Sequence, residues 1–149
     1  MAGPAVVSSS RIMRASPERI FAILTDASRH PDFDGSGMVQ HLRTPYRALR
    51  LGATFTMDMK LGPVPYRMRN TVVEFTPNRL IAWRTIAPYR WRYQLEPVAG
   101  GTRVTESFDW SSLPAIGAPV FAATGLPRRN LTAIQASLAT LADIVENTD

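Results

Sequence analysis

Five aliphatic side chains recur along the last stretch of the chain at the spacing of one helix face. Residues Pro127 to Val145 carry this stripe, which consists of Leu131, Ile134, Leu138, Leu141 and Val145. Steps of three and four residues predict an amphipathic α-helix. The preceding stretch, from Met38 to Trp110, alternates as β-strands do. A lone helix after antiparallel strands buries its stripe against the sheet. We therefore expect a curved sheet and a helix that enclose a cavity, with the stripe half in the core and half in the cavity roof.

Length and composition predict a single domain over residues 1–149. The 45% hydrophobic and 19% charged content is typical of a globular protein. The chain has no Cys, which excludes disulfides, thiolate catalysis and Cys-based metal sites. Residues 1–15 lack the pattern of a signal peptide, and no apolar run approaches the ~20 residues of a membrane span. We expect a cytoplasmic protein without stable membrane insertion, as a monomer or homodimer.

The net charge of +5 comes from 17 basic and 12 acidic side chains, and every basic residue except Lys60 is an arginine. The arginines are scattered, with no run longer than Arg128-Arg129. Without a concentrated basic patch or a recognition motif, we predict that nucleic acid is not a partner.

The N-terminal half predicts a strand, a capped helix and two more strands. The first strand runs from Val6 to Arg14, and Ser16 and Pro17 are typical of a helix start, with the helix ending near Asp26. Residues 30–37 have the composition of a turn. Further strands are predicted at 38–42 and 54–61.

The two histidines, His30 and His41, do not form a metal-ligand pattern with Asp32 and Asp34. We interpret this segment as a turn with solvated acids and predict neither a metal nor a cofactor. No nucleophile elbow or phosphate-binding loop is present, so the catalytic residues stay unknown.

Turn positions predict how three hairpins pair. A turn at 76–79 sets Val73 opposite Ala82 and Thr71 opposite Arg84. In the next hairpin, a tight turn at Ile86-Ala87 sets Arg84 beside Tyr89 and Ala82 beside Trp91. A turn at Ala99-Gly100 pairs Leu95 with Val104, Tyr93 with Glu106, and Trp91 with Phe108. These registers define one inner face, which carries Val73, Phe75, Leu80, Ala82, Tyr89, Trp91, Tyr93, Leu95, Val104, Phe108 and Trp110.

Three charged residues fall on this predicted inner face: Arg69, Arg84 and Glu106. One interpretation is a structural Arg–Glu pair or solvent-accessible edge positions. The other is that they are polar anchors of an apolar pocket. A turn one residue longer would flip a strand and exchange Arg84 for Trp83.

The predicted ligand-binding residues come from this inner face, from a Met-rich strand and from two loops. They are Phe33, Met57, Met59, Arg69, Arg84, Tyr89, Trp91, Tyr93, Glu106, Phe108, Phe121 and Leu126. The last two belong to a Pro/Gly-rich stretch before the final helix, which is either a lid over the cavity or an irregular helix start. The two methionines are either core filler or an adaptable pocket wall.

The order of these motifs resembles the START-like (SRPBCC) superfamily, in its bacterial polyketide cyclase/dehydrase-type branch. The residues that carry the resemblance are Ser16 to Phe21 and Asp26, His30 to Phe33, Val72 to Leu80 with Trp83, Gly100 to Thr105 with Trp110, and Arg129 to Leu141. The resemblance implies an α+β helix-grip fold, in which a curved antiparallel sheet of about seven strands wraps around a long C-terminal helix. It also implies a deep hydrophobic cavity for lipids, polyketides, sterols or aromatic molecules.

Three functions follow as hypotheses. The first is binding of a small hydrophobic molecule, with Glu106, Arg84 and Arg69 orienting its polar group. The second is a polyketide cyclase or dehydratase, in which these arginines stabilise an enolate while Glu106 or Tyr93 exchanges protons. The third is a protein-interaction module that uses the arginine-rich outer face.

Overall fold

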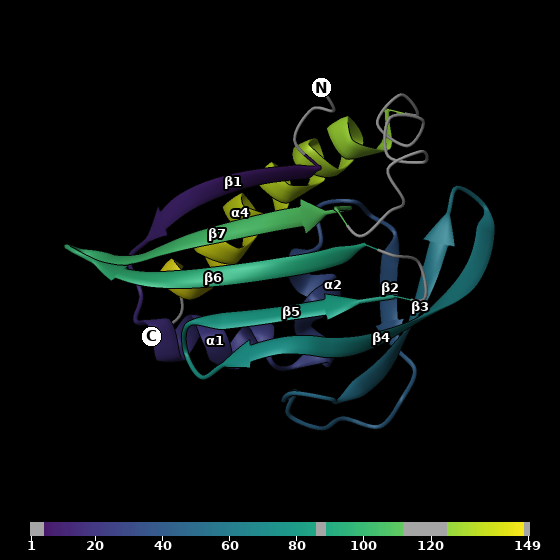
Figure 1. Ribbon diagram of the computed structural model, residues 1–149, viewed down its shortest axis with the longest axis horizontal. Helices are drawn as coiled ribbons and strands as arrows, with labels where there is room; N and C mark the ends of the chain where they lie inside the picture. The colour runs from purple at the N-terminus through teal and green to yellow at the C-terminus, as the bar shows by residue number, and fades with distance from the viewer. Residues whose placement is uncertain (1–4, 86–88, 112–124, 148–149) are drawn as a thin grey trace.

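A seven-stranded antiparallel sheet and one long helix dominate the computed structural model, which describes residues 5–85, 89–111 and 125–147 (Figure 1). The strands lie in the order β1-β7-β6-β5-β4-β3-β2. The elements are β1 (Val6–Met13), α1 (Pro17–Leu24), the 3-10 turn η1 (Ala27–Arg29), α2 (His30–Phe33), β2 (Val39–Leu42), β3 (Thr54–Leu61), β4 (Val64–Thr76), β5 (Leu80–Arg84), β6 (Arg90–Val98), β7 (Gly101–Asp109) and α4 (Leu126–Asn147). The predicted α+β helix-grip fold is confirmed.

Helix α4 packs against β1 and β7, as its stripe predicts (Figure 1). Ile134, Leu138, Leu141 and Val145 are each at most 2% exposed. Full burial of one such side chain stabilises the fold by about 1.5–3 kcal/mol. The stripe therefore anchors the helix to the sheet.

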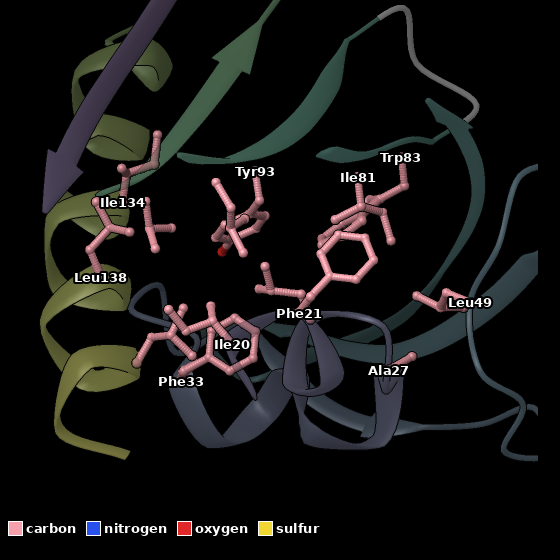
Figure 2. Packing of buried hydrophobic residues seen from close by; sticks show 14 of the residues in the cluster. Ile20, Phe21, Ala27, Phe33, Leu49, Ile81, Trp83, Tyr93, Ile134 and Leu138 are labelled. Carbon is pink, nitrogen blue, oxygen red and sulfur yellow. The ribbon is translucent and has the colours of Figure 1, made fainter. Parts of the chain in front are cut away.

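Helix α1 begins as its sequence predicts. The Ser16 side chain accepts a hydrogen bond from the Arg19 backbone N–H, and Pro17 occupies the first turn. Ile20, Phe21 and Leu24 are buried, and Figure 2 shows Ile20 and Phe21 among the buried side chains between the short helices and the sheet. The ring of Phe21 lies 5.5 Å from that of Phe75 on β4.

The segment predicted as a turn with solvated acids is different in the structure. Its first four residues form α2, which buries His30 and Phe33 on one side. The following loop contacts α4, where the Gly35 N–H donates a hydrogen bond of 2.7 Å to Ser137 Oγ. A Cβ at Gly35 would lie 2.7 Å from both the Ala136 Cβ and the Ser137 N, so only glycine permits this approach.

The β6–β7 register is as predicted: Trp91 pairs with Phe108, Tyr93 with Glu106, and Leu95 with Val104. The predicted β5–β6 register is wrong by one residue. In the structure Arg84 pairs with Arg90, and Trp83 pairs with Trp91. The Ile86-Ala87 turn assumed for this hairpin lies outside the described residues.

The prediction of the β4–β5 register is correct for one of its two pairs. Thr71 pairs with Arg84 as expected, but a β-bulge between Val72 and Glu74 sets Glu74, not Val73, opposite Ala82. A bulge adds one residue to a strand, so the residues on its two sides change faces relative to a regular strand.

Replacing Gly35 with alanine should destabilise the fold. The added methyl group collides with α4, and overpacking of this kind costs about 2 kcal/mol. Urea denaturation followed by circular dichroism measures the loss. Thr132→Ala, on the exposed side of α4, is the control. Equal stability of Gly35→Ala and the unmodified protein would contradict the close contact.

Candidate functional site

A cavity of about 240 Å³ lies between the inner face of the sheet, α2 and the N-terminal half of α4. Strands β2 to β7 all contribute to its wall. The lining comprises Val39, Phe55, Met57, Met59, Tyr66, Met68, Asn70, Trp83, Thr85, Tyr89, Trp91, Tyr93, Glu106 and Phe108 from the sheet and its loops, His30, Phe33, Asp34, Ser36 and Met38 from α2 and the following loop, and Asn130, Ala133 and Ser137 from α4. Aromatic rings and thioethers make most of this surface.

The structure brings together eight of the residues predicted from the sequence. Phe33, Met57, Met59, Tyr89, Trp91, Tyr93, Glu106 and Phe108 all line the cavity. That any of them binds a ligand stays a prediction. Phe121 lies outside the described residues, as does the side chain of Leu126, and so does most of the loop that was considered as a lid.

Two predicted residues do not belong to the cavity. Arg69 and Arg84 are exposed, and the placement of both on the inner face was wrong. The bulge in β4 turns Arg69 outward and Asn70 inward, while the shifted β5–β6 register turns Arg84 outward and Trp83 inward. The alternative with a longer turn is the correct one for β5. Neither arginine lies beside Glu106, so the structural Arg–Glu pair is also excluded.

A cluster of rings around His30 was not predicted from the sequence. The imidazole stacks on Trp83 with ring centroids 4.8 Å apart, and Phe55 and Phe33 each meet it edge-on at 5.6 Å. Tyr93 continues the cluster at 5.8 Å from Trp83. The signal in the sequence was the spacing of His30 and Phe33, which places both on one face of a helical turn.

His30 is neutral in this environment. Its Nε2 lies 2.9 Å from the carbonyl oxygen of Leu24, to which the protonated nitrogen donates a hydrogen bond. Burial lowers the pKa of His30 below its ordinary 6.5, against the opposing influence of that hydrogen bond and of Asp26 and Asp34. His30 therefore adds a polar ring but no positive charge to the cavity at neutral pH.

Glu106 on β7 is the most perturbed acid of the site. It is 3% exposed, and burial raises its pKa from the ordinary 4.5 to about 8. Hydrogen bonding with Tyr93 acts in the opposite direction, and the charge of Asp34 raises the pKa further. Burial also raises the pKa of Tyr93, as does the neighbouring Glu106. Glu106 is therefore mostly protonated at pH 7.

The cavity roof on α4 is a different row of side chains from the aliphatic stripe. Asn130, Ala133 and Ser137 line the cavity, whereas Ile134 and Leu138 belong to the core. The expectation that the stripe itself roofs the cavity was wrong, because the helix turns its neighbouring row of small and polar residues toward the space. The roof thus supplies room and hydrogen-bonding groups.

The arginine-rich outer face is partly neutralised. Arg92 and Arg90 lie 2.7 and 3.1 Å from the carboxylate of Glu74, and Arg103 lies 3.2 Å from Glu96. These pairs leave the outer surface less basic than the residue count suggests. Arg69 and Arg84, which the structure turns outward, add positive charge to the same face, so the interaction-module hypothesis stays a prediction.

Residues 4–146 match the profile of the family described as polyketide cyclase / dehydrase and lipid transport. The chain belongs to this family. An uncharacterised protein of Mycobacterium tuberculosis, Rv0088, is 38% identical over 146 residues, which are 95% of this chain and 65% of that protein. The chain therefore spans about two thirds of the length of the curated relatives it matches.

Solved structures share the START-like fold. The protein NE0264 from Nitrosomonas europaea matches with a TM-score of 0.72 at 14% identity, over 99% of this chain and 97% of that one. The polyketide-cyclase-like protein Cgl2372 from Corynebacterium glutamicum matches with a TM-score of 0.59 at 22% identity, over 99% and 93%. Matches at identities this low establish the fold but do not indicate which ligand this chain binds.

Within the described part of the chain, no helix has the length and apolar character needed to cross a membrane. The expected cytoplasmic location and the monomeric or homodimeric state stay predictions.

Glu106→Gln should change how stability depends on pH. Between about pH 5 and pH 8 the folded protein keeps a proton on Glu106 that the unfolded chain has lost, so stability falls as pH rises. The slope is at most about 1.4 kcal/mol per pH unit. Because the amide does not titrate, the variant should lack this component and become the more stable protein toward pH 8.

Urea denaturation at pH 5, 6, 7 and 8 measures the difference between the two proteins. The lowered pKa of His30 makes stability rise with pH in both proteins, so this contribution cancels when the two are compared. Parallel stability curves would show that Glu106 titrates normally.

Proposed function

We propose that this protein binds a small hydrophobic molecule in the cavity between the sheet and α4. The observation that carries the proposal is the composition of the wall, where rings and thioethers surround a few buried polar groups. Ligand sites have this character, with apolar surface for affinity and a small number of polar groups for orientation. Membership of a family described by polyketide cyclisation and lipid transport supports the proposal.

The cavity volume favours a compact ligand. At about 240 Å³ the space is near the lower end of ligand pockets, which start at about 300 Å³. A molecule with one to three fused rings fits such a space better than a long acyl chain. The rings of Trp83, Trp91 and Phe108 line the cavity and offer aromatic surface to a ligand ring. Met57 and Met59 adapt to irregular outlines.

The polar anchors differ from those predicted from the sequence. With Arg69 and Arg84 outside, the groups on the sheet side of the wall that can orient a ligand include Glu106, Tyr93 and Asn70. Glu106 and Tyr93 face each other across β6 and β7. Two adjacent hydroxyl or carboxyl groups in an apolar wall orient the polar end of a ligand.

An enzymatic function is the second candidate, and the protonation of Glu106 favours it. A buried carboxyl with a pKa of about 8 is a suitable general acid at neutral pH. A cyclase or dehydratase would use it to protonate a carbonyl or a leaving hydroxyl of a β-keto compound. Turnover of a synthetic poly-β-ketone by the unmodified protein and loss of at least tenfold in Glu106→Gln would support catalysis. Unchanged substrate in both proteins would leave binding as the function.

Filling the cavity should abolish ligand binding. In Ala133→Leu the larger side chain projects from α4 into the cavity, while Thr132→Leu adds a similar bulk on the exposed side of the same helix. We expect at least tenfold weaker binding of 2-propylnaphthalene to Ala133→Leu, and unchanged binding to Thr132→Leu. Isothermal titration calorimetry measures both affinities.

Equal affinities in the two leucine variants would place the binding site elsewhere. Absence of binding to the unmodified protein would remove the proposal for compact aromatic ligands.

A further inference from the structure

The charged groups that line the cavity are all acidic. Among the described residues, the wall contains the carboxyl groups of Glu106 and Asp34 but no lysine or arginine. The chain has 17 basic side chains, so their exclusion from this surface is a property of the fold and not of composition. Because His30 is neutral there, the part of the wall that the structure describes carries no compensating positive group.

Glu106 is incompletely partnered. Its Oε1 atom is buried and has no hydrogen-bond partner among the described residues. A buried carboxyl oxygen without a partner is destabilising, and a native protein rarely retains such a group without use. Since the residue lines the cavity, a ligand group is the partner that can meet this oxygen.

Aromatic faces surround the same end of the sheet. Phe108 is two residues from Glu106 on β7. The ring centroids of Trp91 and Tyr89 lie 4.9 and 5.0 Å from that of Phe108. Ring faces carry partial negative charge and attract cations, most strongly where water is excluded. An acid beside several ring faces is an environment suited to positive charge.

We propose that the ligand of this cavity is a hydrophobic amine, whose ammonium group pairs with Glu106 while its apolar part stacks on the aromatic wall. This inference rests on the proposed binding function and specifies its ligand class. It separates the protein from binders of carboxylates, because the described residues of the wall include no lysine or arginine to hold an anion.

The charge of Asp34 argues against a carbonyl ligand. It raises the pKa of both Glu106 and Tyr93, which shows that it makes the potential around them negative. A ligand N–H or ammonium group gains from that potential, whereas a carbonyl oxygen does not. A carbonyl oxygen would have to accept a hydrogen bond from the protonated form of Glu106, and that form becomes less populated as the pH rises toward 8.

The two ligand classes therefore predict opposite pH dependence. An ammonium group pairs with the carboxylate, so its affinity rises as pH increases toward 8, and binding releases a proton from Glu106. A ketone loses its donor over the same range. The other titratable groups among the described lining residues are Tyr93 on β6, Tyr66 on β4, Tyr89 before β6, His30 on α2 and Asp34 after it. Both Tyr93 and Tyr66 have raised pKa values and stay neutral below pH 9, and α4 contributes only uncharged groups to the wall.

Three probes of nearly equal shape test the inference: 2-naphthylethylamine, 2-propylnaphthalene and 2-naphthylacetone. The amine stays protonated across the experiment because primary amines have pKa values near 10. Calorimetric titrations at pH 6, 7 and 8 give affinities, and repetition in two buffers of different ionisation enthalpy counts the protons released. We expect the amine to bind at least tenfold tighter than 2-propylnaphthalene at pH 8, and about tenfold weaker at pH 6 than at pH 7.

Glu106→Gln should remove the preference for the amine and leave the affinity for 2-propylnaphthalene within twofold. That second value also reports whether the variant keeps its cavity. Glu96→Gln, which removes an exposed carboxyl group from the outer face of β6, is the matched control and should retain the preference. If Glu106→Gln does not fold, the proton count and pH dependence in the unmodified protein decide the question.

Binding of 2-propylnaphthalene without any preference for the amine would overturn the inference and leave the proposed function standing. A preference for the ketone that fades toward pH 8 would overturn it in favour of a carbonyl ligand. Failure of all three probes to bind would overturn both the amine inference and the proposed binding function.

Discussion

One extra residue in β4 determines which side chains the cavity receives. The bulge between Val72 and Glu74 keeps Phe75 pointing into the core while it reverses the alternation of the strand before it. Met68 and Asn70 consequently line the cavity and Arg69 reaches solvent. Without the bulge, a guanidinium would face the interior of the sheet, where an unpaired charge is strongly unfavourable. The apolar and acidic character of the site depends on this local irregularity.

The same constraint explains why a carboxyl group is tolerated in the wall. With no arginine beside it, Glu106 cannot form a buried ion pair and instead keeps its proton, because neutralisation costs less than burying a bare charge. The protonated group then behaves as a polar anchor in a space made of rings and thioethers. The family description names no ligand, and these particular residues give the cavity its chemistry.

Most of the fold was predictable because it depends on local patterns. The stripe of α4, the cap at Ser16 and the strand at Thr54–Leu61 follow from spacing and from side-chain chemistry within one element. The β6–β7 hairpin was also correct, and with it the pairing of Tyr93 and Glu106. Errors began where one strand was counted from another, since a single bulge or a longer turn exchanges the two faces of a strand. The helical turn at His30 was missed because four residues carry too little periodicity to separate a helix from a turn.

The sequence by itself determined the strands, helices α1 and α4, their order along the chain, and the presence of an aromatic surface facing an amphipathic helix. Periodicity fixes which residues share a face within an element, so Trp91, Tyr93, Glu106 and Phe108 were found without a structure. Tertiary structure alone decided that Arg69 and Arg84 leave the cavity, that Trp83 and His30 enter it, and that Ser137 rather than the aliphatic stripe forms its roof. The physical reason is that strand register and helix rotation are set by contacts between distant segments. These contacts include the approach of Gly35 to α4.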